Sequence, residues 1–290
     1  MSNQLSRKEY IYLDWNVIQR FKNGDFTIRL KELKRRFDKK NLQFFFTDAH
    51  LMEASAITLT DTNRKNKILN QDLNSLSILS NNLYLERVKN SDETKFFNAH
   101  PAEVYKQKGE YFKIFRNAFI GALENINFEK IWGDTVHPQL SANYLNNFDE
   151  EEIIEKINEL LKTDEISQVF KQYGTKATSF DDLVSKVHSH LNQENNNSLN
   201  LLSDYFSTAF TLLDGLGFKS EKRRNEKFYS SIFDIRHAFN ATRTKYFITD
   251  DEKLRLKAKV LYQWFGFDTV IMDIREMSKL IAIKVKVEEV

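Results

Sequence analysis

Short apolar runs that stop at or just before carboxylates recur near both ends of the chain. Residues 10–13 (Tyr-Ile-Tyr-Leu) end at Asp14, and Tyr246–Ile248 is followed within three residues by Asp250 and Asp251. Continuous runs of this length are typical of strands buried on both faces of a parallel sheet. The pattern predicts further strands at Gln43–Phe46, Leu83–Leu85, Thr269–Met272 and, with alternating polarity, Ile281–Val287.

The segments around these strands place apolar residues at helical spacing. Ile28, Leu30, Leu33 and Phe37, for example, share one face, and lysines and arginines occupy most of the other. Asn16 is expected to cap a helix that runs to about Phe21, and Thr47 or Asp48 a helix that carries Glu53. Other helices are predicted at 64–80, Phe96–Glu103, Gly109–Asn125, Glu150–Leu161, Asn200–Leu213, Phe228–Arg243, Glu252–Phe265 and Arg275–Leu280.

Strands and helices alternate only in the two ends of the chain. This alternation predicts an α/β fold in which helices cover a parallel sheet. Residues 91–227 lack the alternation and are expected to form a large, mainly helical insertion. Residues 1–90 and 228–290 would then belong to one discontinuous domain.

Composition narrows the class of protein. With 290 residues, only 8 Gly and 2 Pro, the chain favours long helices over a turn-rich all-β architecture. Because there is no cysteine, disulfides and thiolate metal sites are excluded. No apolar run approaches the roughly 18 residues of a membrane span, and the first residues lack the apolar core of a signal peptide. We therefore expect a cytoplasmic protein without a membrane partner.

Charge is distributed unevenly although the net charge is only +2. Residues 19–40 contain nine lysines and arginines against three acids, and residues 219–227 contain five against two. Such runs are either solvated helix faces or contacts for phosphate groups. The residues proposed for nucleic-acid contact are Arg20, Lys22, Lys34, Arg35, Arg223 and Arg224.

The carboxylates at the strand ends point to metal chemistry. If the strands before Asp14 and Asp250 are neighbours, their carboxyl ends meet at one edge of the sheet, where sites of open α/β sheets form. Glu53 and Asp234, on helices, can lean towards the same edge. Crowded carboxylates repel one another, and oxygen-only ligation suits Mg²⁺ or Mn²⁺. Such ions support phosphodiester cleavage.

Simpler roles exist for each of these residues. Asp14 could cap a helix, Glu53 could be solvated, and Asp234 could pair with Arg236 or Arg243. One residue of the pair Asp250–Asp251 could also be a helix cap. His50 and His237 lie one helical turn from Glu53 and Asp234, where a supporting hydrogen bond is expected and a general-acid role is the alternative.

These segments resemble the motifs of the PIN-domain nucleases, which show four acids in this order and in these strand and helix contexts. The resemblance covers roughly residues 8–90 and 228–275, and it does not extend to the helical middle. The matching segments are Asp14-Trp15-Asn16, Glu53 after the second strand, Asp234-Ile235-Arg236-His237-Ala238-Phe239-Asn240-Ala241, and Thr249-Asp250-Asp251.

The resemblance implies a three-layer fold and Mg²⁺- or Mn²⁺-dependent cleavage of RNA. Its catalytic, metal-binding acids would be Asp14, Glu53, Asp234 and Asp251, with Asp250 as an adjacent ligand. Asn16 and Thr249 would hold the carboxylates, or a metal-bound water, through hydrogen bonds.

The resemblance leaves several alternatives open. The same site could cut DNA, or the chain could be a PIN-like scaffold that binds RNA or protein without catalysis. By analogy with members of the family that it resembles, the chain could be a toxin or a defence effector. The insertion could bind a protein inhibitor or another partner, and the chain could form oligomers.

Overall fold

The chain folds into two compact units. A computed structural model describes residues 9–26, 28–57, 59–87, 94–124, 150–161, 177–192, 199–215, 218–219 and 225–282. The first unit comprises Met1–Ala118, Arg236–Arg255 and Asp268–Val290. The second comprises Phe119–Ile235 and Leu256–Phe267.

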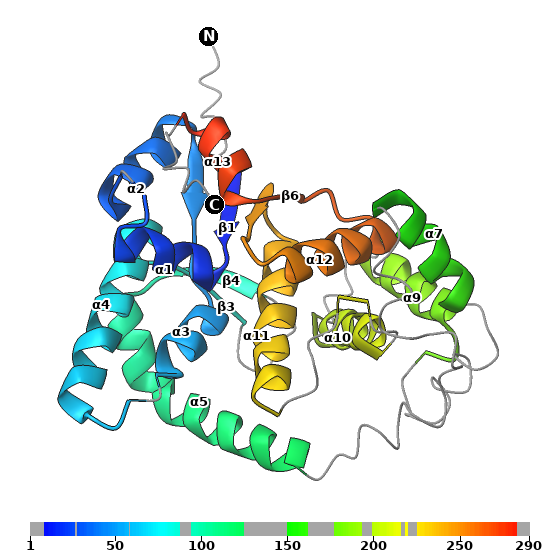
Figure 1. The fold of residues 1–290 in the computed structure, drawn as a ribbon, viewed down its shortest axis with the longest axis horizontal. Helices are drawn as coiled ribbons and strands as arrows, with labels where there is room; N and C mark the ends of the chain where they lie inside the picture. Colours follow the sequence, from blue (N-terminus) through cyan, green and yellow to red (C-terminus); the bar gives the residue numbers. More distant parts are fainter. Residues whose placement is uncertain are drawn as a thin grey trace. The chain divides into compact units, whose positions relative to one another are not determined.

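A four-stranded parallel sheet forms the centre of the first unit (Figure 1). Its strands, in the order β2-β1-β5-β6, are Leu42–Phe44, Glu9–Leu13, Tyr246–Ile248 and Val270–Met272. The registers pair Leu13 with Ile248, so β1 and β5 are neighbours although they lie at opposite ends of the sequence. The α/β class with a parallel sheet flanked by helices is therefore confirmed.

Burial of β1 explains why its sequence is apolar on both faces. Side chains of successive strand residues point to opposite faces of a sheet. Ile11, Tyr12 and Leu13 are all 0% exposed, so both faces are covered at this point. Tyr12 therefore brings a hydroxyl group into the interior, where it requires a hydrogen-bonding partner.

Helices flank the sheet of the first unit (Figure 1). The helix α2 contacts both β2 and α4, and α13 contacts β6. Leu33 and Phe37 of α2 are 0% exposed, as expected for the apolar face of this helix. The helices α1 to α5 and α13 span Trp15–Asn23, Leu30–Lys39, Asp48–Ser55, Thr62–Ser80, Pro101–Glu124 and Ile274–Leu280.

The prediction of a helix at Phe96–Glu103 was wrong for the first half of this segment. Thr94–Asn98 is a strand, β4, which pairs antiparallel with β3 (Leu83–Arg87) in a second, two-stranded sheet. The Phe96 ring stacks on Tyr10 with a centroid distance of 4.7 Å and also packs against Phe45. These tertiary contacts favour the extended backbone, and the helix begins only at Pro101, a residue common at the first helical position.

In the second unit, the described helices are α7 (Glu150–Leu161), α9 (Phe180–Asn192), α10 (Leu199–Gly215) and the larger part of α12 (Glu252–Phe265). Trp264 anchors this part: its ring packs edge-on against Phe180 and its Nε1–H donates to Asn158. Lys257 forms an ion pair with Asp214. The helix α11 (Asn225–Ala241) contributes to both units.

Two further predictions concern the ends of the chain and membranes. The strand predicted at Ile281–Val287 lies, after residue 282, outside the described residues. Among the described helices, none combines the length and the apolar character needed to cross a membrane. The predicted insertion at 91–227 stays a prediction, and part of α5 within it is assigned to the first unit.

Candidate metal centre

In the sheet of the first unit, the order in which successive strands are added reverses between β1 and β5. From β1 the chain continues to β2 on one side, whereas β5 continues to β6 on the other. Such a switch point leaves a crevice outside the carboxyl ends of the two central strands, where ligands of open α/β sheets bind. Asp14 follows β1 and Thr249 follows β5, so both residues lie at this position.

Asp14 is held in place by the residues around it. Its Oδ1 accepts a hydrogen bond of 2.8 Å from the Trp15 amide, and its Oδ2 lies 2.9 Å from the Thr249 hydroxyl. Asp14, rather than the predicted Asn16, is the N-cap of α1. Asn16 lies two positions further on and is exposed. The predicted cap was wrong because the helix begins directly at the strand end.

Glu53 and His237 meet at the same place from two helices. Nε2 of His237, on α11, lies 2.6 Å from Oε2 of Glu53, on α3. The His237 side chain is 0% exposed and that of Glu53 is 18% exposed. Asp14, Glu53 and His237 each offer one ligand atom to a group whose atoms all lie within 4.8 Å of one another.

Burial controls the ionisation of this group. Burial, the largest influence, raises the pKa of Asp14 to about 6, against the opposing effects of His237 and the Thr249 hydrogen bond. It also raises the pKa of Glu53 well above its usual value, and lowers the pKa of His237 to about 4. The carboxylates are therefore costly to ionise here, and a divalent cation would offset that cost.

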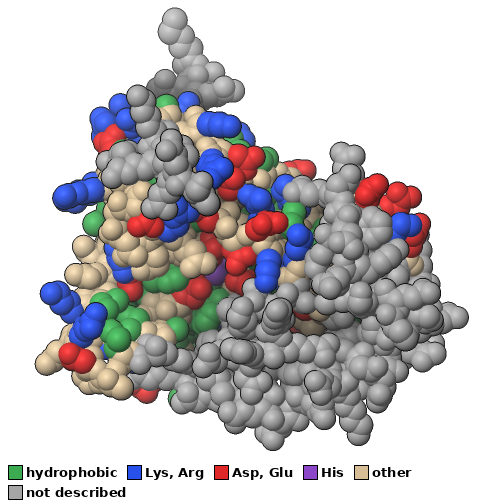
Figure 2. All heavy atoms as spheres, in the orientation of Figure 1, with side chains coloured by type: hydrophobic (Ala, Val, Ile, Leu, Met, Phe, Trp, Pro, Cys, Tyr) green, Lys and Arg blue, Asp and Glu red, His purple; other side chains and the backbone are tan. Residues whose placement is uncertain are grey.

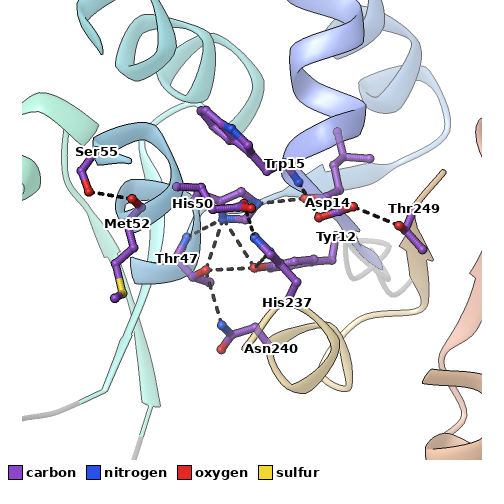
Figure 3. Close-up of polar contacts among 12 residues, drawn as sticks. Tyr12, Asp14, Trp15, Thr47, His50, Met52, Ser55, His237, Asn240 and Thr249 are labelled. Atoms are coloured by element: carbon purple, nitrogen blue, oxygen red, sulfur yellow. Dashed lines mark hydrogen bonds and ion pairs between the residues drawn. The ribbon is translucent and has the colours of Figure 1, made fainter. Parts of the chain in front are cut away.

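A buried hydrogen-bond network supports this group (Figure 3). The Tyr12 hydroxyl lies 2.9 Å from Oγ1 of Thr47 and 2.9 Å from Nδ1 of His237. Nε2 of His50 lies 2.9 Å from the carbonyl oxygen of Leu13, directly before Asp14. His50, which was predicted to support the acids, thus holds the end of β1 rather than a carboxylate.

Asp250 and Asp251 are adjacent in sequence, but their side chains have different partners. Asp250 forms an ion pair with Arg20, and its Oδ1 accepts the Ile274 amide at the start of α13. Asp251 accepts the Leu254 amide at 3.0 Å, as a cap of α12, and its own amide donates to the Thr249 hydroxyl. Asp251 is thereby linked to Asp14 through Thr249, whereas Asp250 joins α1 to α13.

Asp234 lies one turn before His237 on α11, is half-buried and is assigned to the second unit. Among the described residues, the group of possible metal ligands contains His237 and not Asp234, Asp250 or Asp251. The structure thus brings together two of the predicted acids and one of the predicted supporting histidines.

The predicted nucleic-acid contacts within α1 and α2 are paired with acids of the protein. Arg20 contacts Asp250, and Lys22 contacts Asp72. Lys34 and Arg35 pair with Asp38 and Glu32 on their own helix. Basic and acidic side chains are accordingly interspersed over this part of the first unit (Figure 2). Arg223 and Arg224 lie outside the described residues.

Tyr12 and Thr47 belong to the site although neither was predicted to do so. Tyr12 was assigned only to a buried strand, and Thr47 only as a possible helix cap. The one available signal was a tyrosine in the middle of a strand predicted to be covered on both faces, since a buried hydroxyl needs a partner.

Carboxylate oxygens within a few ångströms of one another can hold a hard cation such as Mg²⁺ or Mn²⁺. The donor set present here therefore fits such an ion. No protein-family model matches this sequence, and no curated protein and no solved structure shows significant similarity to the chain.

Proposed function

We propose that the chain is a metal-dependent nuclease of the PIN type that hydrolyses phosphodiester bonds in RNA. The observation that carries this proposal is the group of buried Asp14, half-buried Glu53 and buried His237, whose possible ligand atoms lie within 4.8 Å of one another at the switch point of a parallel sheet. The order of the acidic motifs along the sequence supports the same family.

The residues of the chain have distinct tasks in this proposal. Asp14 and Glu53 hold Mg²⁺ or Mn²⁺, and Asp251, whose backbone amide donates to the Thr249 hydroxyl that bonds Asp14, is the further acid proposed for the site. The bound ion would supply an activated water and stabilise the leaving oxygen. Thr249 and the Trp15 amide fix the orientation of the Asp14 carboxylate, so little reorganisation is needed when substrate binds.

The proposal is tested with purified full-length protein and end-labelled single-stranded RNA, with Mn²⁺, Mg²⁺ or EDTA. We expect internal cleavage that needs the metal and that Asp14→Asn and Glu53→Gln abolish. Glu103→Gln, which alters an exposed acid on α5, is the matched control and should cleave normally. A single-stranded DNA of the same sequence separates RNA from DNA cleavage.

Cleavage that survives both site substitutions would reject the proposed site. Absence of both cleavage and Mn²⁺ binding by calorimetry would instead favour a PIN-like scaffold without catalysis. Cleavage of DNA alone would keep the site and reject the RNA substrate.

A further inference from the structure

The hydrogen bonds that lead from α3 through Tyr12 to Glu53 have only one consistent direction. Each link joins groups that could in principle donate or accept, so distances alone do not show where the hydrogens lie. Two backbone groups at one end remove this ambiguity, because an amide can only donate and a carbonyl oxygen can only accept.

His50 is the fixed end of the chain of hydrogen bonds. Its Nδ1 lies 3.1 Å from the Thr47 amide, which must donate, so Nδ1 carries no hydrogen. Its Nε2 lies 2.9 Å from the Leu13 carbonyl oxygen, which must accept, so Nε2 carries the hydrogen. Both contacts require the same neutral form of the ring, and burial, which lowers the pKa of His50, favours it.

The Thr47 hydroxyl must therefore donate to Tyr12. In the capping box of α3, Oγ1 of Thr47 accepts the His50 amide. Nδ2 of Asn240 also donates to this oxygen, at 3.5 Å. The Thr47 hydrogen can then point to the Tyr12 oxygen at 2.9 Å or to His50 Nδ1 at 3.2 Å. The single lone pair of Nδ1 already accepts the Thr47 amide. The Tyr12 oxygen, at the shorter distance, is the remaining acceptor.

Tyr12 in turn must donate to His237. Its oxygen accepts from Thr47, and Nδ1 of His237 lies 2.9 Å away, against 3.5 Å for the occupied Nδ1 of His50. His237 Nδ1 is then an acceptor, so the hydrogen of the neutral ring is on Nε2. That nitrogen lies 2.6 Å from Oε2 of Glu53 and donates to it.

We propose that Tyr12 is a positioning residue that makes His237 a hydrogen-bond donor to Glu53 and thereby leaves only carboxylate oxygens of this group to bind a metal ion. A ring nitrogen that carries hydrogen has no lone pair for a cation. The oxygen-only set selects hard ions such as Mg²⁺ and Mn²⁺ over Zn²⁺, which imidazole nitrogen would favour. The metal part of this proposal rests on the proposed function, but the direction of the hydrogen bonds does not.

The direction of the hydrogen bonds is tested by nitrogen-15 NMR of the histidine rings in the metal-free, full-length protein. The chain has 6 histidines, and the His237 signals are assigned by their loss in His237→Gln. We expect a bare Nδ1 and a protonated Nε2 for both His50 and His237. A protonated Nδ1 on His237 would overturn the proposal, whether or not the protein cleaves RNA.

Tyr12→Phe removes the hydroxyl without changing the shape of the ring. We expect the His237 signals to move towards a mixture of the two neutral forms, because Nδ1 loses its donor. Thr47→Ser keeps the hydroxyl and should preserve the wild-type signals. Tyr84→Phe removes the hydroxyl of another buried tyrosine, bonded to Asp48, and is the matched control. Unchanged His237 signals in Tyr12→Phe would contradict the role of Tyr12.

Metal preference gives a second readout. We expect the ratio of Zn²⁺ to Mg²⁺ affinity, measured by calorimetry, to rise about tenfold in Tyr12→Phe and to stay at the wild-type value in Tyr84→Phe. An unchanged ratio would overturn the role of Tyr12 in metal selection. If wild type binds neither ion, the proposed function and this metal selection fail together, while the NMR result still decides the direction of the hydrogen bonds.

Discussion

The Thr249 hydroxyl lies 2.9 Å from Oδ2 of Asp14 and joins the ends of two strands that are 235 positions apart in sequence. The same hydroxyl oxygen accepts the Asp251 amide at 3.1 Å. Because that amide must donate, the hydroxyl hydrogen is available to Asp14. Thr249 thus favours the ionised form of Asp14 and opposes burial, which raises the pKa of this carboxyl.

Thr249→Val removes this hydrogen bond and keeps the shape of the side chain. We expect metal affinity and cleavage to fall about 10- to 100-fold, since the carboxylate loses both its orientation and a contact that favours its charge. Calorimetry with Mn²⁺ and RNA cleavage rates measure the two effects.

Thr249→Ser, which keeps the hydroxyl, is the control and should stay within about threefold of wild type. Equal losses in the valine and serine variants would show that packing, rather than the hydroxyl, is what the site needs.

The two central strands, β1 and β5, were predictable because each contains a short apolar run whose residues are largely buried. Tyr246–Ile248 was placed at its observed bounds, and the helix Glu252–Phe265 also matches. The strand Thr94–Asn98 was missed because its sequence has no strong local signal and its conformation depends on pairing with β3. The helix Phe180–Asn192 was not predicted at all.

The site was predictable only in part. Asp14 and Glu53 could be proposed because they follow strands whose carboxyl ends meet. The direct contact between His237 and Glu53 depends on how the helices α11 and α3 are oriented relative to each other. No pattern in the sequence determines that orientation. Asp250 and Asp251 are adjacent and chemically identical, so only the structure shows that Asp250 is engaged by Arg20.

The raised pKa of Asp14 predicts a pH-dependent effect of Asp14→Asn on the stability of the metal-free protein. Folding shifts this pKa from 3.8 to about 6, so the folded state binds more protons than the unfolded state within that window. The contribution of Asp14 is therefore present below about pH 4 and is lost as the pH rises through about 6. Asparagine does not titrate, so the stability of the variant relative to wild type should increase by about 2–3 kcal/mol from pH 4 to pH 7.

Urea unfolding in EDTA at several pH values measures this difference. The lowered pKa of His237 acts in the opposite sense, because its contribution is present above about pH 6.5 and is lost as the pH falls through about 4. Comparing Asp14→Asn with wild type at each pH largely separates the two effects. A stability difference that does not change with pH would contradict the raised pKa.

Asp250→Asn and Asp251→Asn should separate a structural acid from a catalytic one. Asp250 pairs with Arg20 and accepts the Ile274 amide, so its substitution should lower the free energy of unfolding by about 1–2 kcal/mol and leave the cleavage rate nearly unchanged. Asp251→Asn should abolish cleavage at a similar or smaller cost in stability. A variant Asp250→Asn that folds normally and has lost cleavage would assign the catalytic role to Asp250 instead.

Lys34 and Arg35 provide a test of nucleic-acid binding on α2. Their acidic partners lie on the same helix, and such exposed pairs contribute little to stability. We expect the double variant Lys34→Gln, Arg35→Gln to weaken RNA binding. The slope of log affinity against log salt concentration should become shallower by the amount that about one to two lost phosphate contacts would cause. The matched control is the double variant Lys39→Gln, Lys40→Gln at the end of α2, which lowers the charge equally. Equal losses in both would indicate a general effect of charge.

Removal of the metal should lower the thermal stability of the first unit. The carboxylates of buried Asp14 and half-buried Glu53 are close, so the folded state gains free energy from a cation that the unfolded chain cannot bind in the same way. At about 100 times the dissociation constant the gain is about 2.7 kcal/mol, which corresponds to a rise in Tm of roughly 5–10 °C. Calorimetric melting with Mn²⁺ and then with EDTA measures it. The rise should vanish in Asp14→Asn and Glu53→Gln and persist in Glu103→Gln; a rise that persists in both site variants would place the ion elsewhere.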